Sequence, residues 1–131
     1  MDEFRDYILD HYKHPRNYGV LENPDISYTE GNPSCGDELR IDLKLRDGII
    51  EDVRFSGHGC AISMAAASIL TEMIKGKPLV EVRNLGKEEM LEALMIPIGP
   101  VRLKCALLAL KVFKSAAYGL KGWPGEEDEE G

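Results

Sequence analysis

The sequence predicts an α+β fold in which a small antiparallel sheet of about three strands packs against several helices. Two observations predict the sheet. Apolar and charged residues alternate over residues 39–46, and Asp47-Gly48 separates this run from a second run at residues 49–55. An Asp-Gly pair between two such runs is typical of a two-residue hairpin. A third observation, apolar residues at helical spacing before and after the hairpin, predicts helices that cover one face of the sheet.

The N-terminal segment DEFRDYILDHYKH is predicted to form an amphipathic helix, because its apolar residues recur at roughly helical spacing. Pro15 ends this helix, since the residue before a proline avoids the helical region. His11 and His14 lie near the end of the helix and are expected to face water. After a loop, we expect a short strand around Ile26 to Glu30.

The hairpin has one buried face and one wet face. Its first strand alternates apolar residues with arginine, aspartate and lysine, and the returning strand is expected over residues 49–55. The apolar residues of the first strand are Leu39, Ile41, Leu43 and Leu45.

Helices are expected after the hairpin. The segment AISMAAASILTEMIKGK carries an apolar stripe at helical spacing, and Gly76 and Pro78 end it. Two short helical segments are expected around residues 79–84 and at KEEMLEALM. The last helix is expected to begin near Pro100, because proline is favoured in the first turn, and to continue to Gly119. The stripe consists of Ile62, Ala65, Ala66, Ile69 and Met73.

Length and composition suit one domain. The chain has 131 residues, of which residues 1–122 are expected to form a single domain and residues 123–131 a disordered acidic tail. A formal net charge of -7 argues against nucleic acid as a partner. No apolar run is long enough to cross a membrane, and the acidic N-terminus does not resemble a signal peptide. We therefore expect a cytoplasmic protein.

The three cysteines indicate metal binding or thiol chemistry. An odd number of cysteines without an export signal argues against a disulfide framework, although three unrelated buried thiols remain an alternative. Each cysteine lies at a predicted boundary: Cys35 in a loop, Cys60 where a strand meets a helix, and Cys105 near the start of the last helix. There is no C-x-x-C pair, so a zinc finger is excluded and a site assembled from distant segments is favoured.

The positions of Cys60 and Cys105 favour the thiolate form. A helix N-terminus stabilises a nearby anion, and Lys104 and Arg102 add positive charge near Cys105. Thiolates from all three cysteines suit zinc or an iron–sulfur cluster.

Asp37, two residues after Cys35, is a candidate fourth ligand, but a loop-capping carboxylate explains it equally well. His58 is expected at the surface rather than as a ligand. A hydrolytic pair of Cys60 with His58 is a weaker alternative, because no orienting residue is recognisable.

Four segments together resemble the U-type iron–sulfur cluster assembly scaffolds, the group of IscU, SufU and NifU N-terminal domains. They are HYKHPRNYG, NPSCGDELRIDLKL, GHGCAISMAAAS and PVRLKCALLALK. The resemblance covers residues 2–119. It implies an α+β scaffold that accepts sulfur from a cysteine desulfurase, builds a transient [2Fe–2S] cluster and passes it to apo-proteins.

The resemblance also implies the roles of individual residues. The ligands of the cluster, and of Zn²⁺ in the resting form, are then Cys35, Asp37, Cys60 and Cys105. Cys35 and Cys105 are candidate persulfide acceptors, and Asp37 is the ligand that keeps the cluster labile.

Two departures separate this chain from typical IscU proteins. IscU has histidine immediately before the third cysteine, whereas Lys104 here resembles SufU, in which zinc orders the site and the protein relays persulfide. The insertion usual in SufU between the second and third cysteines is missing. In IPIGPVR, Gly99 replaces the first proline of the chaperone-recognition stretch and Pro100 remains, so chaperone docking is left open.

Three functions stay open from the sequence: a cluster scaffold, a SufU-type zinc-dependent sulfurtransferase, and a small domain with structural zinc. An enzymatic role is therefore undecided. The sequence leaves an oligomer open as well.

Overall fold

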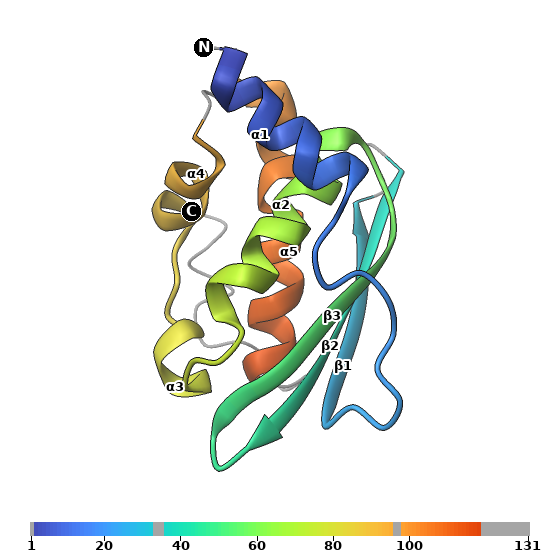
Figure 1. Ribbon diagram of the computed structural model, residues 1–131, viewed down its shortest axis with the longest axis vertical. Coiled ribbons are helices and arrows are strands. Elements are labelled where there is room, and N and C mark those ends of the chain that lie inside the picture. The colour runs from blue at the N-terminus through green and yellow to red at the C-terminus, as the bar shows by residue number, and fades with distance from the viewer. Residues whose placement is uncertain (1, 33–35, 96–97, 119–131) are drawn as a thin grey trace.

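The computed structural model describes residues 2–32, 36–95 and 98–118 (Figure 1). Its helices and strands confirm the predicted α+β class. The predicted acidic tail, residues 123–131, lies outside the described residues. In chain order the elements are α1 (Asp2–Lys13), β1 (Ile26–Asn32), β2 (Asp37–Arg46), β3 (Ile49–His58), α2 (Ala61–Ile74), α3 (Leu79–Val82), α4 (Lys87–Leu94) and α5 (Pro100–Tyr118).

The three strands form an antiparallel sheet in the order β1-β2-β3. The predicted hairpin is confirmed: Asp47 and Gly48 form its turn, with φ angles of 52° and 79°. Two successive positive φ values define the turn whose twist matches that of the strands, which explains why Asp-Gly predicted it. All three strands begin or end beyond the predicted limits, and β3 continues to His58, close to Cys60.

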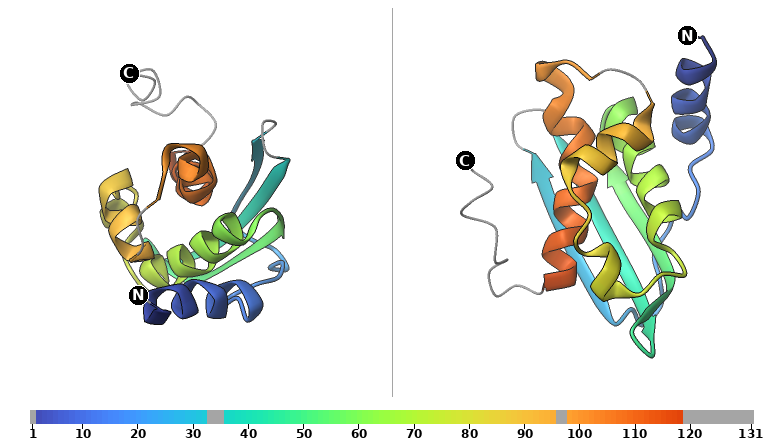
Figure 2. Two further views of the ribbon diagram at one scale, coloured as in Figure 1. Left: turned by 90° about the horizontal axis from the view of Figure 1, so that it is seen from above. Right: turned by 90° about the vertical axis from the view of Figure 1, so that its left-hand side faces the viewer.

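The helices lie on one face of the sheet (Figures 1 and 2). Helix α5 packs against β1 and β2, α2 packs against β3 and α5, and α1 packs on α2. Because α2 has neighbours on several sides, burial extends beyond the predicted stripe to Ser63, Ala67, Ser68 and Leu70. Among the described residues, no helix combines the length and the apolar character that crossing a membrane requires.

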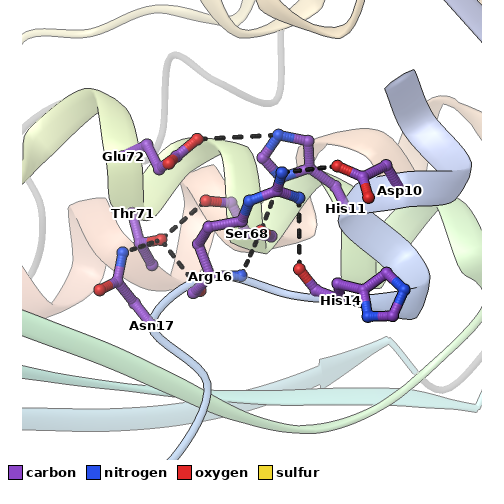
Figure 3. A network of polar contacts seen from close by, with 8 residues as sticks. All are labelled: Asp10, His11, His14, Arg16, Asn17, Ser68, Thr71 and Glu72. Carbon is purple, nitrogen blue, oxygen red and sulfur yellow. Dashed lines mark hydrogen bonds and ion pairs between the residues drawn. The ribbon is translucent and has the colours of Figure 1, made fainter. Parts of the chain in front are cut away.

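His11 corrects an expectation, because it is buried rather than facing water. Only 2% of its surface is exposed, and its Nδ1 lies 2.7 Å from the hydroxyl oxygen of Ser68 (Figure 3). The same hydroxyl accepts a hydrogen bond from the backbone N–H of Arg16. Figure 3 shows that this network joins α1 and the following loop to α2. His14 is exposed, as expected.

Asp42 also differs from the prediction, because it is buried although it lies on the face of the hairpin that was predicted to be wet. Its buried carboxylate accepts hydrogen bonds from the backbone N–H of Leu21, the hydroxyl of Ser27 and Nε of Arg40. The loop between α1 and β1 covers this part of the sheet, which alternation within one strand could not indicate. Burial of the carboxylate is tolerated because it is hydrogen-bonded and paired.

Candidate metal centre

Asp37, Cys60 and Cys105 meet at one end of the sheet although they are far apart in sequence. Asp37 begins β2, Cys60 lies directly before α2, and Cys105 lies in α5. One carboxylate oxygen and the two sulfur atoms all lie within 4.8 Å of one another. The packing of α2 and α5 side by side on the sheet brings the two thiols together.

The surroundings of Cys60 favour its thiolate. Burial alone raises the pKa of the Cys60 thiol, but hydrogen bonds from Ser63, Cys105 and the backbone of Ile62 outweigh it and lower the pKa below its usual value. Cys60 is the N-cap residue of α2, and its side chain does not make a regular capping hydrogen bond. The N–H groups of Ser63 and Ile62 nevertheless stabilise its negative charge, as expected for an anion at a helix N-terminus.

Asp37 is held through both of its carboxylate oxygens. Oδ1 accepts a hydrogen bond of 3.1 Å from the backbone N–H of Cys60, and Oδ2 accepts one from the hydroxyl of Ser63. A Cβ at Gly59 would lie 2.9 Å from this carboxylate, so glycine leaves the space that Asp37 occupies. The carboxylate is only 4% exposed. Asp37 therefore caps the start of α2, and its carboxylate also lies beside the two thiols.

Cys105 differs from the expectation in its place on the helix. It is the sixth residue of α5, in the second turn, where backbone N–H groups are bonded within the helix rather than free to stabilise an anion. Its side chain is 6% exposed. Arg102 and Lys104, predicted to act on this thiol, both lie at exposed positions of the helix.

Ser63 was not identified from the sequence. It lies on α2 three residues after Cys60, and its hydroxyl oxygen lies 3.6 Å from the Cys60 sulfur and 3.3 Å from the carbonyl oxygen of Cys105. No pattern within the sequence marks this serine, because its hydroxyl contacts Asp37 and Cys105, which come from distant segments.

The donor set fits a metal that prefers sulfur. In tetrahedral zinc with sulfur ligands, neighbouring ligand atoms lie about 3.8 Å apart, so small side-chain movements would suffice here. The sulfur of Cys60 and Oδ2 of Asp37 already lie 3.9 Å apart. Cys35, the third predicted thiol, lies outside the described residues. His58 is exposed, as expected, with its Nε2 3.7 Å from a carboxylate oxygen of Glu38.

The chain resembles curated proteins over most of its length. It is 40% identical to the zinc-dependent sulfurtransferase SufU of Bacillus subtilis, with 91% of this chain and 92% of that protein covered. It is 38% identical to the iron–sulfur cluster assembly scaffold protein IscU of Escherichia coli K12, with 90% and 94% covered.

Solved structures share the fold. A candidate iron–sulfur cluster assembly scaffold of the SUF system, FiSufU from Fervidobacterium islandicum AW-1, superposes with a TM-score of 0.75 at 29% identity, covering 86% of this chain and 94% of that one. The family described as NifU-like N-terminal domain matches residues 3–126. Because that match spans nearly the whole chain and agrees with both relatives, the protein belongs to the family of NifU-like N-terminal domains.

Proposed function

We propose that the chain is an iron–sulfur cluster assembly scaffold that receives sulfur from a cysteine desulfurase and passes a transient [2Fe–2S] cluster to apo-proteins. The observation that carries this proposal is the meeting of Asp37, Cys60 and Cys105 in a member of this family. The similarity to IscU supports it. We propose in addition that the protein is cytoplasmic, as the sequence led us to expect.

The proposed ligand set is Asp37, Cys60, Cys105 and Cys35, which stands two residues before Asp37 in the sequence. Two described thiols and one carboxylate offer the donors that zinc accepts. We propose that Zn²⁺ occupies these ligands in the resting form, where it would hold the segments that carry them together. The cluster is then the cargo of the same residues.

Sulfur transfer would follow thiol exchange. The thiolate of Cys35 or Cys105 attacks the outer sulfur of the desulfurase persulfide, a new S–S bond forms, and the desulfurase cysteine leaves as a thiolate. Because Cys105 is buried, an incoming persulfide reaches it only after local opening, which favours Cys35 as the first acceptor.

Cluster formation also requires electrons. Each persulfide sulfur needs a pair of electrons to become sulfide. The two ferrous ions supply half of the electrons that the two sulfurs need, on becoming ferric. A dithiol reductant supplies the other half.

A zinc-dependent sulfurtransferase of SufU type is the second candidate function. Lys104 favours it, because a protonated lysine cannot serve as the nitrogen ligand that histidine would provide at this position. The similarity to SufU of Bacillus subtilis is consistent with it. In this alternative the protein relays persulfide and no cluster is built.

The test is anaerobic reconstitution. The protein, with its metal content measured beforehand, is incubated with a cysteine desulfurase, cysteine, Fe(II) and a dithiol, and the optical spectrum is followed. A scaffold develops [2Fe–2S] absorption and transfers the cluster to an apo-ferredoxin, whereas a Cys60→Ser variant does not. Stimulated desulfurase turnover with zinc bound and no cluster formed would contradict the scaffold and favour the sulfurtransferase.

A further inference from the structure

We propose that Ser63 is a positioning residue, whose hydroxyl orients the Asp37 carboxylate toward Cys60 and Cys105 and thereby sets how tightly the site retains metal. This inference rests on the proposed function, because it takes Asp37 as a ligand. Ser63 itself would not touch the metal. It would act through the hydrogen bond to Asp37.

The hydroxyl of Ser63 has one proton and three acceptors within reach. Oδ2 of Asp37 is the nearest, followed by the carbonyl oxygen of Cys105 at 3.3 Å and the sulfur of Cys60 at 3.6 Å. A hydrogen bond to a charged acceptor is stronger than one to a neutral carbonyl, so the proton belongs on the side of Asp37. Ser63 is completely buried, so water does not compete for this bond.

The second oxygen of Asp37 is fixed independently. The backbone N–H of Cys60 donates to Oδ1, so the carboxylate is held at two points that both belong to the start of α2. Removing the Ser63 hydroxyl leaves one of these points and frees the carboxylate to rotate. Groups that hydrogen-bond to a metal ligand fix its direction, and their loss typically weakens metal binding by about 10–100-fold.

If Ser63 had only a structural role, losing its hydroxyl should have the same effect as losing another buried serine hydroxyl of α2. Ser68 provides the matched control, because it is another completely buried serine of α2, and its hydroxyl bonds to His11 and Arg16 instead of the metal centre. Five residues apart, the two serines point about 140° away from each other around the helix. Both substitutions remove a buried hydroxyl, and only one of them removes a contact to Asp37.

The experiment measures metal retention in the full chain. Zn²⁺ affinity is determined by competition with a chromophoric chelator, and Co²⁺ absorption reports the ligands, for the parent and for Ser63→Ala, Ser68→Ala, Asp37→Ala and the double variant Asp37→Ala/Ser63→Ala. We expect Ser63→Ala to bind Zn²⁺ about 10–100-fold more weakly, with Ser68→Ala equal to the parent. Without Asp37, the second substitution should have no further effect.

Two results would contradict the role of Ser63 and leave the proposed ligand set intact. One is a Zn²⁺ affinity in Ser63→Ala equal to that of the parent. The other is a loss of Zn²⁺ affinity on Ser63→Ala that is the same with and without Asp37. Zn²⁺ affinity unchanged in Asp37→Ala would instead overturn the ligand set of the proposed function as well. If Ser63→Ala fails to fold, Ser63→Thr replaces it. That variant keeps the hydroxyl, so parent-like retention supports the inference, and a loss as large as that of Asp37→Ala contradicts it.

Discussion

The carboxylate of Asp37 accepts a hydrogen bond from the backbone N–H of Cys60, with 3.1 Å between Oδ1 and the nitrogen. This bond joins the first residue of β2 to the residue that caps α2. A hydrogen bond within the protein thus joins the candidate oxygen ligand to the residue that carries one candidate sulfur ligand. A change in the position of Asp37 should therefore also change the position of the residues at the start of α2.

Asp37→Ala should make a reconstituted cluster persist longer. The carboxylate is a hard oxygen ligand among thiolates, and it exchanges more readily than sulfur when an acceptor arrives. The measurement is the decay of cluster absorption and the rate of transfer to an apo-ferredoxin. Cluster loss as fast as in the parent would contradict this role. Zinc retention should move in the opposite direction, because zinc loses a ligand that suits it.

Substitutions at Gly59 and Gly57 should have different effects. A Cβ at Gly59 meets the side chain of Asp37, so Gly59→Ala should displace the carboxylate and weaken metal binding while the fold survives. A Cβ at Gly57 would lie 2.1 Å from the backbone oxygen of Glu38, and the φ angle there is +128°. Gly57→Ala should lower the free energy of unfolding by roughly 2 kcal/mol or more.

Gly99→Ala is the matched control for both glycine substitutions, because among the described residues no atom beyond its chain neighbours lies within 4 Å of the added Cβ. Chemical denaturation gives stability, and chelator competition gives metal affinity. Normal metal affinity in Gly59→Ala would show that the space beside Asp37 is not needed.

Removing metal should leave the chain folded. The sheet, α2 and α5 share a continuous apolar core whose burial favours folding, so we expect folding not to depend on metal. We expect helical circular dichroism to persist in excess chelator, with a lower Tm because a ligand of the native state is lost. The Cys60→Ser variant should show a smaller change on chelation. Collapse of the helical signal would instead support structural zinc, which contributes folding free energy outright.

The stability of the protein should fall on mild acidification because of His11. Burial, together with the charge of Arg16, lowers the pKa of His11, although Glu72 and Asp10 act in the opposite direction. The unfolded chain then binds more protons below about pH 6.5, the ordinary histidine value. The contribution is complete above that pH, declines as the pH falls, and levels off below the lowered pKa of the folded state.

Denaturation at several pH values measures this slope. His11→Gln should flatten it, and His14→Gln, at an exposed position, should not. Equal slopes in the parent and His11→Gln would show that the buried imidazole is not the group responsible.

Lys104→His should prolong metal and cluster retention if this position separates the scaffold from the sulfur relay. A neutral imidazole offers a nitrogen ligand beside Cys105, which a protonated lysine does not. Arg102→His, at another exposed position of α5, is the control. Retention in Lys104→His that matches the parent would mean that Lys104 carries no such distinction.

The sequence was sufficient for the elements and for the choice of candidate ligands. Alternation and Asp47-Gly48 predicted the hairpin, and apolar spacing with Pro100 predicted where α5 begins, because these are signals within a few residues. The ends of the strands were underestimated. Strand pairing with a neighbour, rather than the pattern within one segment, sets where a strand ends.

By itself, the sequence determined the fold class and identified the three cysteines and Asp37 as candidate ligands, since local periodicity and residue chemistry carry that information. Only the tertiary structure decided that Asp37, Cys60 and Cys105 meet, because packing of α2 and α5 on the sheet has no local signature. It also decided that His11 is buried against Ser68 and that Ser63 contacts Asp37. Those contacts join residues from distant segments, and the burial of a polar side chain depends on which partner the fold brings to it.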